Sequence, residues 1–343
     1  MLIVSLTNHQ FRLAARPTGM PDRGNWHYTE EPVREPGDGE VVVKILYVSL
    51  DPAMRGWMNE GRSYIPPVGI GEVMRAIAVG QVIDTKHPDF AKGDHVTGLL
   101  GVQEYVVQDG HGLTKVDPGL APLPVHLNTL GMPGMTAYFG LLDIGRPQPG
   151  ETVVVSGAAG AVGATVGQIA RLKGACAVGI AGGPEKCRLI VEELGFDAAI
   201  DYKAQDVRGA LKDACPDGID VYFDNVGGDT LEAVLGRLAR GARIVICGAV
   251  SQYNEEVTKG PSNYMSLLVN RATMTGFVVF DYADRYGDAA RELGGWLREG
   301  NLKSREDVVD GLDTFPETLR KLFKGENTGK LILQVDGDRR GGR

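Results

Sequence analysis

The stretch Thr-Val-Val-Val-Ser-Gly-Ala-Ala-Gly-Ala-Val-Gly at 152–163 constrains the fold of this chain more than any other. Its first residues, Thr152–Val155, are β-branched and uncharged, which is typical of a strand buried on both faces of a parallel sheet. Three glycines follow, and then a helical pattern with one apolar face, formed by Val162, Val166, Ile169 and Ala170. The stretch therefore predicts a strand, a tight glycine turn and a helix, in that order.

This order of elements is the one that binds the pyrophosphate of a dinucleotide. Glycines lack a Cβ atom, so backbone N–H groups come close to the phosphates, and the helix N-terminus adds positive partial charge. The spacing here is G-x-x-G-x-x-G and not the commoner G-x-G-x-x-G, so the spacing by itself is a weak signal. An ordinary glycine-rich turn is the alternative, and the flanking strand and helix argue against it.

The end of the next predicted strand, Ala177–Ala181, indicates which nucleotide is bound. An NAD-specific site carries Asp or Glu there, about 20 residues past the glycines. This chain has Gly182–Pro184 at that place, and the cation Lys186 and the phenol Tyr202 follow. Charge-assisted donors suit a 2′-phosphate, so the sequence favours NADP(H). The alternative is that Lys186 is a solvated lysine on a helix.

The composition and net charge indicate a globular protein and argue against several other classes of protein. The chain has 343 residues, a formal net charge of −8 and 23% charged residues, which fits a globular protein of two domains. The negative charge argues against nucleic acid or an anionic membrane as a partner. Glycines and Gln168 make the uncharged stretch 152–170 a core segment and not a membrane span. We expect no secretory signal and a cytoplasmic location.

Cysteine and histidine usage predicts no metal site. The four cysteines are widely spaced, and the six histidines are scattered with no pair at ligand spacing. We expect free thiols at Cys176, Cys187, Cys215 and Cys247.

The first 127 residues differ in pattern from the rest. They are β-rich and irregular, with strand-like runs at Val41–Ile45 and Glu104–Val107, which suggests a compact barrel-like domain. Strands and helices then alternate, which is typical of a doubly wound parallel sheet. We predict strands at about 152–156, 176–181, 197–201, 219–224, 242–247 and 273–279, and helices at about 160–174, 184–194, 207–214, 228–239 and 285–298. A short helix at 315–323 and a strand at 331–335 are expected to return to the first domain, and the tail after Val335 to fray.

Ligands bind beyond the carboxyl ends of the strands in such sheets. Three stretches fall there: Asp224–Gly228, Cys247–Tyr253 and Phe277–Val279. The first two contain glycine, so their backbone can approach a ribose or a nicotinamide, although any loop of this kind can contain glycine by chance.

Taken together, the chain resembles the zinc-independent medium-chain dehydrogenase/reductases, and within them the branch of prostaglandin reductases and alkenal double-bond reductases. The resemblance rests on segments in the same order along nearly the whole chain: Tyr47–Trp57, Gly131–Tyr138, Gly157–Gly163, Phe223–Gly228, Cys247–Asn254 and Gly325–Lys330. It implies an α/β fold in which a Rossmann doubly wound parallel sheet is inserted in a GroES-like β-barrel domain. Residues 1–128 and 301–343 would form the GroES-like substrate and catalytic domain, and residues 129–300 the NADP-binding domain.

The resemblance also implies the site. Relatives with catalytic zinc carry Cys where this chain has Ser49–Asp51, and His-Glu where it has Gly71–Glu72, so no metal is expected. NADPH would contact Met135, Thr136, Gly160, Ala161, Val162, Gly163, Lys186, Tyr202, Asn225, Cys247, Gly248, Ala249, Val250, Ser251, Gln252, Tyr253, Phe277, Val278, Val279 and Asn327.

These inferences predict an NADPH-dependent reductase of the C=C bond of α,β-unsaturated ketones or aldehydes. Without zinc a carbonyl lacks a strong Lewis acid, whereas a conjugated C=C bond needs only donors for the charge that collects on the carbonyl oxygen. Tyr253 is the predicted catalytic donor, with a wall of the pocket as its alternative role, and Trp57 and Tyr64 are predicted to contact substrate. Quinone reduction and a non-catalytic NADPH-binding protein are the alternative functions. We also expect a homodimer, with 273–279 as an exposed sheet edge.

Overall fold

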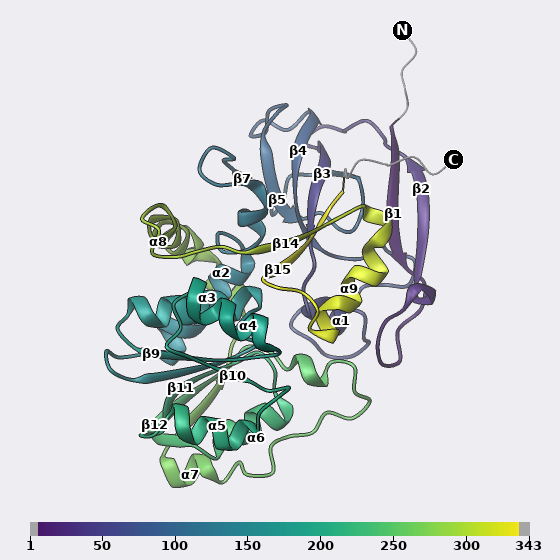
Figure 1. Cartoon of the computed structure of the whole chain (residues 1–343). Helices are drawn as coiled ribbons and strands as arrows, with labels where there is room; N and C mark the ends of the chain where they lie inside the picture. The colour runs from purple at the N-terminus through teal and green to yellow at the C-terminus, as the bar shows by residue number, and fades with distance from the viewer. Residues whose placement is uncertain (1–5, 336–343) are drawn as a thin grey trace. The chain divides into compact units, whose positions relative to one another are not determined.

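The computed structural model describes residues 6–335, which form two compact units (Figure 1). The described residues before Asn128 and after Arg305 make up the first unit, here called the β unit. Asn128–Arg305 makes up the second, here called the Rossmann unit because of its strand order. Each unit is described by itself. The tail that was predicted to fray, residues 336–343, lies outside the described residues.

The β unit is built on a seven-stranded sheet in the order β14-β15-β3-β4-β5-β7, with β6 also paired to β3. A separate pair, β1-β2, accompanies it. The sheet is antiparallel except for β14 and β15, which run parallel. The elements of this unit are β1 Thr7–Leu13, β2 Trp26–Pro32, β3 Val41–Ser49, α1 Ala53–Trp57, β4 Ile77–Thr85, β5 His95–Leu99, β6 Tyr105–Gln108, β7 Thr114–Val116, β14 Glu306–Asp310, α9 Phe315–Lys324 and β15 Lys330–Gln334.

The core of the β unit joins segments from both ends of the chain. Val43 and Ile45 of β3 pack in one buried cluster with Leu333 of β15. Phe315 and Leu319, one helical turn apart on α9, belong to the same cluster. The returning strand and helix are therefore part of the β unit, as the sequence predicted.

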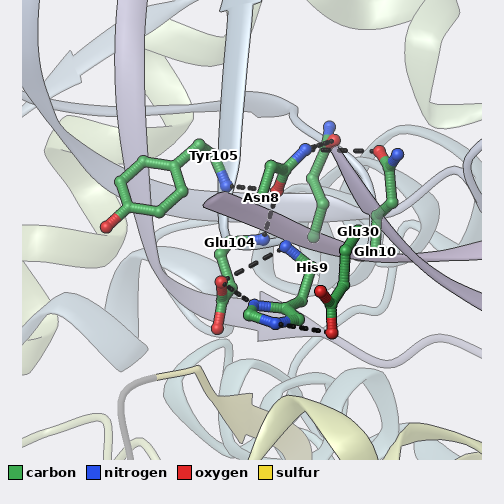
Figure 2. Close-up of polar contacts among 7 residues, drawn as sticks. Asn8, His9, Gln10, Glu30, Glu104 and Tyr105 are labelled. Carbon is green, nitrogen blue, oxygen red and sulfur yellow. Dashed lines mark hydrogen bonds and ion pairs between the residues drawn. The ribbon is translucent and has the colours of Figure 1, made fainter. Parts of the chain in front are cut away.

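Side chains fasten β1 to the segment that leads into β6 (Figure 2). Asn8 Oδ1 accepts the backbone N–H groups of Glu104 (3.1 Å) and Tyr105 (2.9 Å). Next to it, the backbone N–H of His9 donates to Glu104 Oε2 at 3.2 Å, and its ring Nδ1 lies 2.6 Å from the same oxygen. His9 Nε2 lies 3.4 Å from Glu30 Oε1 on β2. These contacts tie the two-stranded pair to the larger sheet.

The Rossmann unit contains a six-stranded parallel sheet in the order β10-β9-β8-β11-β12-β13. Counted within the unit, this is the order 3-2-1-4-5-6 of dinucleotide-binding folds. Its elements are α2 Met132–Phe139, β8 Thr152–Ser156, α3 Ala161–Leu172, β9 Cys176–Ala181, α4 Pro184–Arg188, β10 Ala198–Asp201, α5 Val207–Ala214, β11 Ile219–Asp224, α6 Gly228–Leu235, β12 Leu238–Ile246, α7 Ser266–Asn270, β13 Thr273–Gly276 and α8 Tyr286–Arg298. The predicted alternation of strands and helices is confirmed.

Both faces of this sheet are covered by helices. Val153 and Val155 of β8 belong to a buried cluster that also contains residues of α2, α3 and α8. Val154, which points to the opposite face, belongs to a cluster with Leu211 of α5 and Leu231 of α6. Figure 1 shows α3 and α4 on one side of the sheet and α5 and α6 on the other. The uncharged run in β8 is therefore explained by burial on both faces.

The predicted helix 228–239 is too long. The observed helix α6 ends at Leu235, and β12 already begins at Leu238. Between them the carbonyl oxygen of Arg237 accepts the backbone N–H of Ile219 at 2.9 Å. Backbone pairing with the neighbouring strand β11 thus replaces the last helical turn, which local sequence alone does not reveal.

The predicted strand 273–279 is also too long. The observed strand β13 ends at Gly276, and a 3-10 helix covers Val279–Arg285. The ring of Phe277 packs edge-on against Phe223, with 6.4 Å between centroids, and lies close to Gly140. Phe277, a partly buried residue packed against the core, therefore lies beyond the end of the strand.

Candidate functional site

The turn between β8 and α3 has the geometry of an anion-binding loop. Gly157 has a φ of +61°, and a Cβ atom at Gly163 would collide with the carbonyl oxygen of Gly157. Gly160 is the N-cap of α3 and offers no side chain to the first N–H groups of the helix. The helix N-terminus is therefore left to an external acceptor, and its partial positive charge suits a pyrophosphate.

The ends of β9 and β10 lie side by side, since Ala181 and Asp201 are paired in the sheet. A Cβ atom at Gly182 would lie 2.8 Å from the ring of Tyr202, so this glycine allows the phenol to pack over the end of β9. Tyr202 is 48% exposed, and Lys186 is in the first turns of α4, which follows β9. Of the two residues predicted to bind a 2′-phosphate, Tyr202 thus directly follows β10, and Lys186 is on the helix that follows the neighbouring strand β9.

Asp201 is a carboxylate in this region that the sequence analysis did not single out. Its Oδ1 accepts the backbone N–H groups of Gly183 (2.8 Å) and Lys203 (3.0 Å). These backbone hydrogen bonds lower the pKa of Asp201, and the one from Gly183 has the largest effect. The carboxylate therefore shapes the turn after β9, where Gly183 has a φ of +95°.

Asp224, at the end of β11, organises the opposite side of the site. It is 1% exposed, and its Oδ1 accepts hydrogen bonds from the hydroxyls of Ser156 (3.0 Å) and Tyr222 (2.8 Å). The same oxygen accepts the backbone N–H groups of Val226 (3.0 Å) and Gly227 (2.9 Å). Burial raises the pKa of Asp224, and these hydrogen bonds oppose the rise. The sequence analysis placed Asp224 in a ligand-facing stretch but missed this role.

Backbone carbonyl groups of the loop after β11 also accept hydrogen bonds from the loop after β12. The carbonyl oxygen of Asp224 accepts the N–H groups of Cys247 (2.9 Å) and Gly248 (3.0 Å). The carbonyl oxygen of Val226 accepts both the N–H (3.1 Å) and the hydroxyl (2.6 Å) of Ser251. The predicted nicotinamide-side residues after β11 and after β12 therefore form one hydrogen-bonded rim.

Asn225 and Tyr253 are both held within this rim. The Asn225 side chain donates from Nδ2 to the carbonyl oxygen of Ser156 at 2.7 Å. The hydroxyl oxygen of Tyr253 accepts the backbone N–H of Ala249 at 3.2 Å and lies close to Gly248. The phenol is thus folded back over its own loop, and its oxygen is fixed beside the glycine backbone.

Other predicted cofactor residues lie around this rim and in the core. Burial, with the charge of Asp224 as a second cause, raises the pKa of Cys247 to about 12, so its thiol stays protonated at neutral pH. Met135 is buried in the core cluster of α2 and α3, and Thr136 Oγ1 donates to the carbonyl oxygen of Met132 at 2.8 Å. The carbonyl oxygen of Val279 accepts the hydroxyl of Tyr286 at 2.9 Å.

Three predicted residues belong to the β unit. Asn327 is buried, and its amide donates to the carbonyl oxygen of Gly329 at 2.9 Å. Trp57, also buried, donates from its indole Nε1 to the hydroxyl oxygen of Tyr64 at 3.2 Å. The predicted roles of these three residues toward cofactor and substrate stay predictions.

The positions where zinc-dependent relatives carry ligands have other chemistry here. Asp51 accepts hydrogen bonds from the Ser49 hydroxyl and from Lys330 Nζ, the latter at 2.5 Å. Lys330 is 2% exposed, and burial lowers its pKa. Glu72 accepts the backbone N–H of Gly69 at 2.8 Å. A carboxylate already paired with an ammonium group does not fit a zinc ligand. Within residues 6–335, no three His, Cys, Asp or Glu side chains are arranged to hold a metal ion.

Comparison with known families covers both units. Residues 9–116 match a model described as the N-terminal domain of oxidoreductase, and residues 161–294 match one described as zinc-binding dehydrogenase. In the part of the chain that the structure describes, no helix has the length and apolar character needed to cross a bilayer.

Known proteins resemble the chain along its length. It is 46% identical to the NADPH-dependent curcumin reductase of Escherichia coli (strain K12) over 96% of this chain and 98% of that protein. It is 41% identical to the NADP(+)-dependent 2-alkenal reductase of Nicotiana tabacum, with the same coverage of this chain and of that protein. The crystal structure of CurA from Vibrio vulnificus in complex with NADPH matches with a TM-score of 0.91 and 44% identity, over 96% of this chain and 99% of that one. The chain therefore belongs to the medium-chain dehydrogenase/reductase family, in the branch of alkenal and prostaglandin reductases that its motifs predicted.

Proposed function

We propose that this protein uses NADPH to reduce the conjugated C=C bond of α,β-unsaturated ketones and aldehydes. The observation that carries the proposal is the 46% identity to an NADPH-dependent curcumin reductase, which extends over 96% of this chain. The likeness to a 2-alkenal reductase supports the same bond type, because a 2-alkenal is an aldehyde whose C=C bond is conjugated with the carbonyl.

The proposed cofactor site lies along the carboxyl edge of the parallel sheet. In it, the glycine turn Gly160–Gly163 binds the pyrophosphate, and Lys186 and Tyr202 bind the 2′-phosphate. The nicotinamide side is formed by Asn225, by the rim Cys247–Tyr253, by Phe277–Val279, and by Met135 and Thr136. The uncapped start of α3 and the two rim loops, which are hydrogen-bonded to each other, support this assignment.

Tyr253 is the proposed donor for the reaction. NADPH, when bound, supplies a hydride, and negative charge then collects on the carbonyl oxygen of the substrate. A positioned hydrogen-bond donor stabilises that charge. The Tyr253 oxygen accepts from the backbone of Ala249, which orients the phenol within the rim, and a tyrosine hydroxyl is both a donor and an acceptor.

Reduction of a C=C bond is a better match to this donor set than oxidation of an alcohol at zinc. The Asp51 carboxylate is paired with Lys330, and Gly71–Glu72 supplies no imidazole. Hydrogen-bond donors alone suffice for a conjugated acceptor, because the charge that develops is spread over the carbonyl group.

A panel of acceptors tests the proposal. Consumption of NADPH, followed by its absorbance, is measured with enones, quinones and alkyl aldehydes that lack a C=C bond. We expect turnover with enones at rates well above those with the saturated aldehydes. Faster turnover with quinones would favour the quinone reductase alternative. Tight NADPH binding without turnover of any acceptor would favour a non-catalytic protein.

We also propose that the protein is a homodimer that acts in the cytoplasm. β13 forms an edge of the six-stranded sheet, and Leu268 and Val269 of the neighbouring α7 are 70% and 64% exposed. An open sheet edge beside exposed apolar side chains is a surface that self-association would cover. The four free cysteines suit a reducing compartment. Sedimentation as a monomer at micromolar concentration would contradict the dimer, and recovery in a membrane or secreted fraction would contradict the location.

A further inference from the structure

Tyr286, the first residue of α8, has a hydroxyl that joins two segments of the Rossmann unit. The hydroxyl donates to the carbonyl oxygen of Val279 at 2.9 Å, and it lies 3.7 Å from the sulfur of Met132, the first residue of α2. The Tyr286 ring packs against the buried cluster that contains residues of α2, α3 and α8. Burial raises the pKa of Tyr286 to about 12, so its hydroxyl stays protonated and remains a donor at neutral pH.

Both of these segments belong to the nicotinamide side of the proposed cofactor site. Val279 ends the stretch Phe277–Val279, which follows the strand β13 at the carboxyl edge of the parallel sheet. Met132 begins the helix that carries Thr136, and its carbonyl oxygen accepts the Thr136 hydroxyl at 2.8 Å. The side chain of Tyr286 therefore links two stretches that are proposed to contact the nicotinamide, although Tyr286 itself is in neither of them.

The stretch after β13 has backbone donors that the chain does not use. Phe277, Val278 and Val279 are half-buried, and none of them donates a backbone hydrogen bond to an acceptor within residues 6–335. Backbone N–H groups that are buried away from water are nearly always paired. These three donors are therefore left for an acceptor from outside the chain, and the carboxamide of a nicotinamide carries a carbonyl oxygen that can accept.

Other contacts fasten the 3-10 helix that precedes α8 by its side chains. Tyr282 stacks on Phe139 with 4.7 Å between ring centroids, and Arg285 forms an ion pair with Asp143. The hydroxyl of Tyr282 makes no hydrogen bond within the described part of the chain. Among these three side chains, Tyr286 is thus the one that holds the backbone of the ligand-facing stretch.

We propose that Tyr286 is a positioning residue for the nicotinamide ring, because its hydroxyl fixes Val279 and, through Val279, the backbone donors of the stretch after β13. This inference rests on the proposed function, in which that stretch contacts the nicotinamide. The hydrogen bond holds the carbonyl group of Val279 and so limits rotation of the two peptide groups that this residue joins. A nicotinamide that is held in one place keeps its hydride at a constant distance from the acceptor.

The test separates the two ends of the cofactor and needs no turnover. Calorimetry gives the dissociation constants of NADPH and of 2′-phospho-ADP-ribose, which is the same molecule without the nicotinamide, for the wild type, Tyr286→Phe and Tyr282→Phe. Tyr286→Phe keeps the ring and removes only the donor to Val279. Tyr282→Phe is the matched control, because it removes a hydroxyl that has no hydrogen-bond partner among residues 6–335.

We expect Tyr286→Phe to weaken the binding of NADPH by about three- to tenfold, the effect of one neutral hydrogen bond. The dissociation constant of 2′-phospho-ADP-ribose should change by less than about twofold, which also shows that the variant is folded. The kcat for an enone at saturating NADPH should fall as well, because a mobile ring spends less time at the reacting distance. Tyr282→Phe should leave all three quantities at their wild-type values.

The outcomes separate this inference from the proposed function. If enones are reduced but Tyr286→Phe binds NADPH as the wild type does, or loses affinity for both nucleotides by the same factor, the inference is overturned and the function stands. Equal effects of Tyr286→Phe and Tyr282→Phe on NADPH also overturn it. If the loss is selective for NADPH while no acceptor is reduced, the positioning role stands and the proposed function fails. If the wild type binds neither nucleotide, both fail.

Discussion

Tyr253 is the residue on which the proposed chemistry depends most directly. Tyr253→Phe keeps the ring and removes the hydroxyl whose oxygen accepts from Ala249. We expect kcat for an enone to fall by about 100-fold, the loss that follows removal of one donor to a developing oxyanion. The KM for NADPH should stay within about twofold. Tyr264→Phe, at a tyrosine that is 60% exposed, is the control. An unchanged kcat would leave Tyr253 as a wall of the pocket.

Lys186 tests the choice of cofactor. Lys186→Glu replaces a cation with an anion where the 2′-phosphate is proposed to bind. We expect the KM for NADPH to rise by about tenfold or more, since a charge-assisted contact becomes a repulsion, while the KM for NADH changes little. Steady-state kinetics with both cofactors and one enone measure the difference. Equal changes for NADPH and NADH would contradict the assignment.

Asp224 is a positioning residue that sequence reasoning did not find. Asp224→Ala removes the acceptor of four donors, three of them in buried hydrogen bonds, and each buried donor left unpaired costs about 1–3 kcal/mol. We expect lower stability in urea and a KM for NADPH that rises more than kcat falls, because the rim loses its shape. Asp224→Asn keeps one acceptor oxygen and should recover part of both properties. A KM for NADPH that stays at the wild-type value in Asp224→Ala would show that the rim does not depend on this carboxylate.

Sequence motifs predict the role of a residue best when that role follows from backbone geometry. Gly163 was predictable because the turn excludes a Cβ atom, which a glycine spacing reveals. Asp224 carried a partial signal, since it ends a strand just before Asn225 and two glycines.

At the scale of elements, the β8–α3 turn offers a direct test of the glycine requirement. Gly163→Ala would force the new methyl group against the carbonyl oxygen of Gly157. We expect a stability loss of about 1–3 kcal/mol, as for other overpacked sites, together with weaker NADPH binding. Denaturant unfolding and fluorescence titration measure the two effects.

The control for that substitution is Gly287→Ala in the first turn of α8. The added methyl group there meets no atom closer than 3.7 Å, and the backbone is helical. We expect unchanged NADPH binding and a small gain in stability, because alanine favours a helix over glycine. If Gly163→Ala behaved like Gly287→Ala, the turn would not be as tight as the geometry requires.

Sequence patterns predicted the existence of these elements better than their ends. The strand β8 and the helix α3 follow from local periodicity, because burial on both sides of a strand and one apolar helix face leave a local mark. The end of α6 depends on backbone pairing of Arg237 with Ile219 of β11. Just past the end of β13, Phe277 packs edge-on against Phe223 of β11. Contacts between segments far apart in the chain decide such boundaries, and a local pattern does not contain them.

At the scale of the whole molecule, the domain organisation was indicated by the order of two sequence patterns along the chain, the β-rich pattern and the alternation of strands and helices. A β-rich stretch, then strict alternation, then a final helix and strand predicted a first domain that the chain leaves and re-enters. The structure has this organisation, since β15 pairs with β3 and α9 packs in the core of the β unit. The resemblance of motifs over nearly the full length, now matched by relatives at 41–46% identity, extended the prediction from fold to activity.

The proposed activity makes one claim that a single experiment tests: the hydride is added to the β-carbon of a conjugated carbonyl compound, and the carbonyl group survives. The protein is incubated with a linear enone and NADPH that carries deuterium at C4 of the nicotinamide, on either face, and the product is analysed by NMR. We predict the saturated ketone, with deuterium at the β-carbon from one of the two labelled cofactors. An allylic alcohol with deuterium at the former carbonyl carbon, or recovery of the unchanged enone, would contradict it.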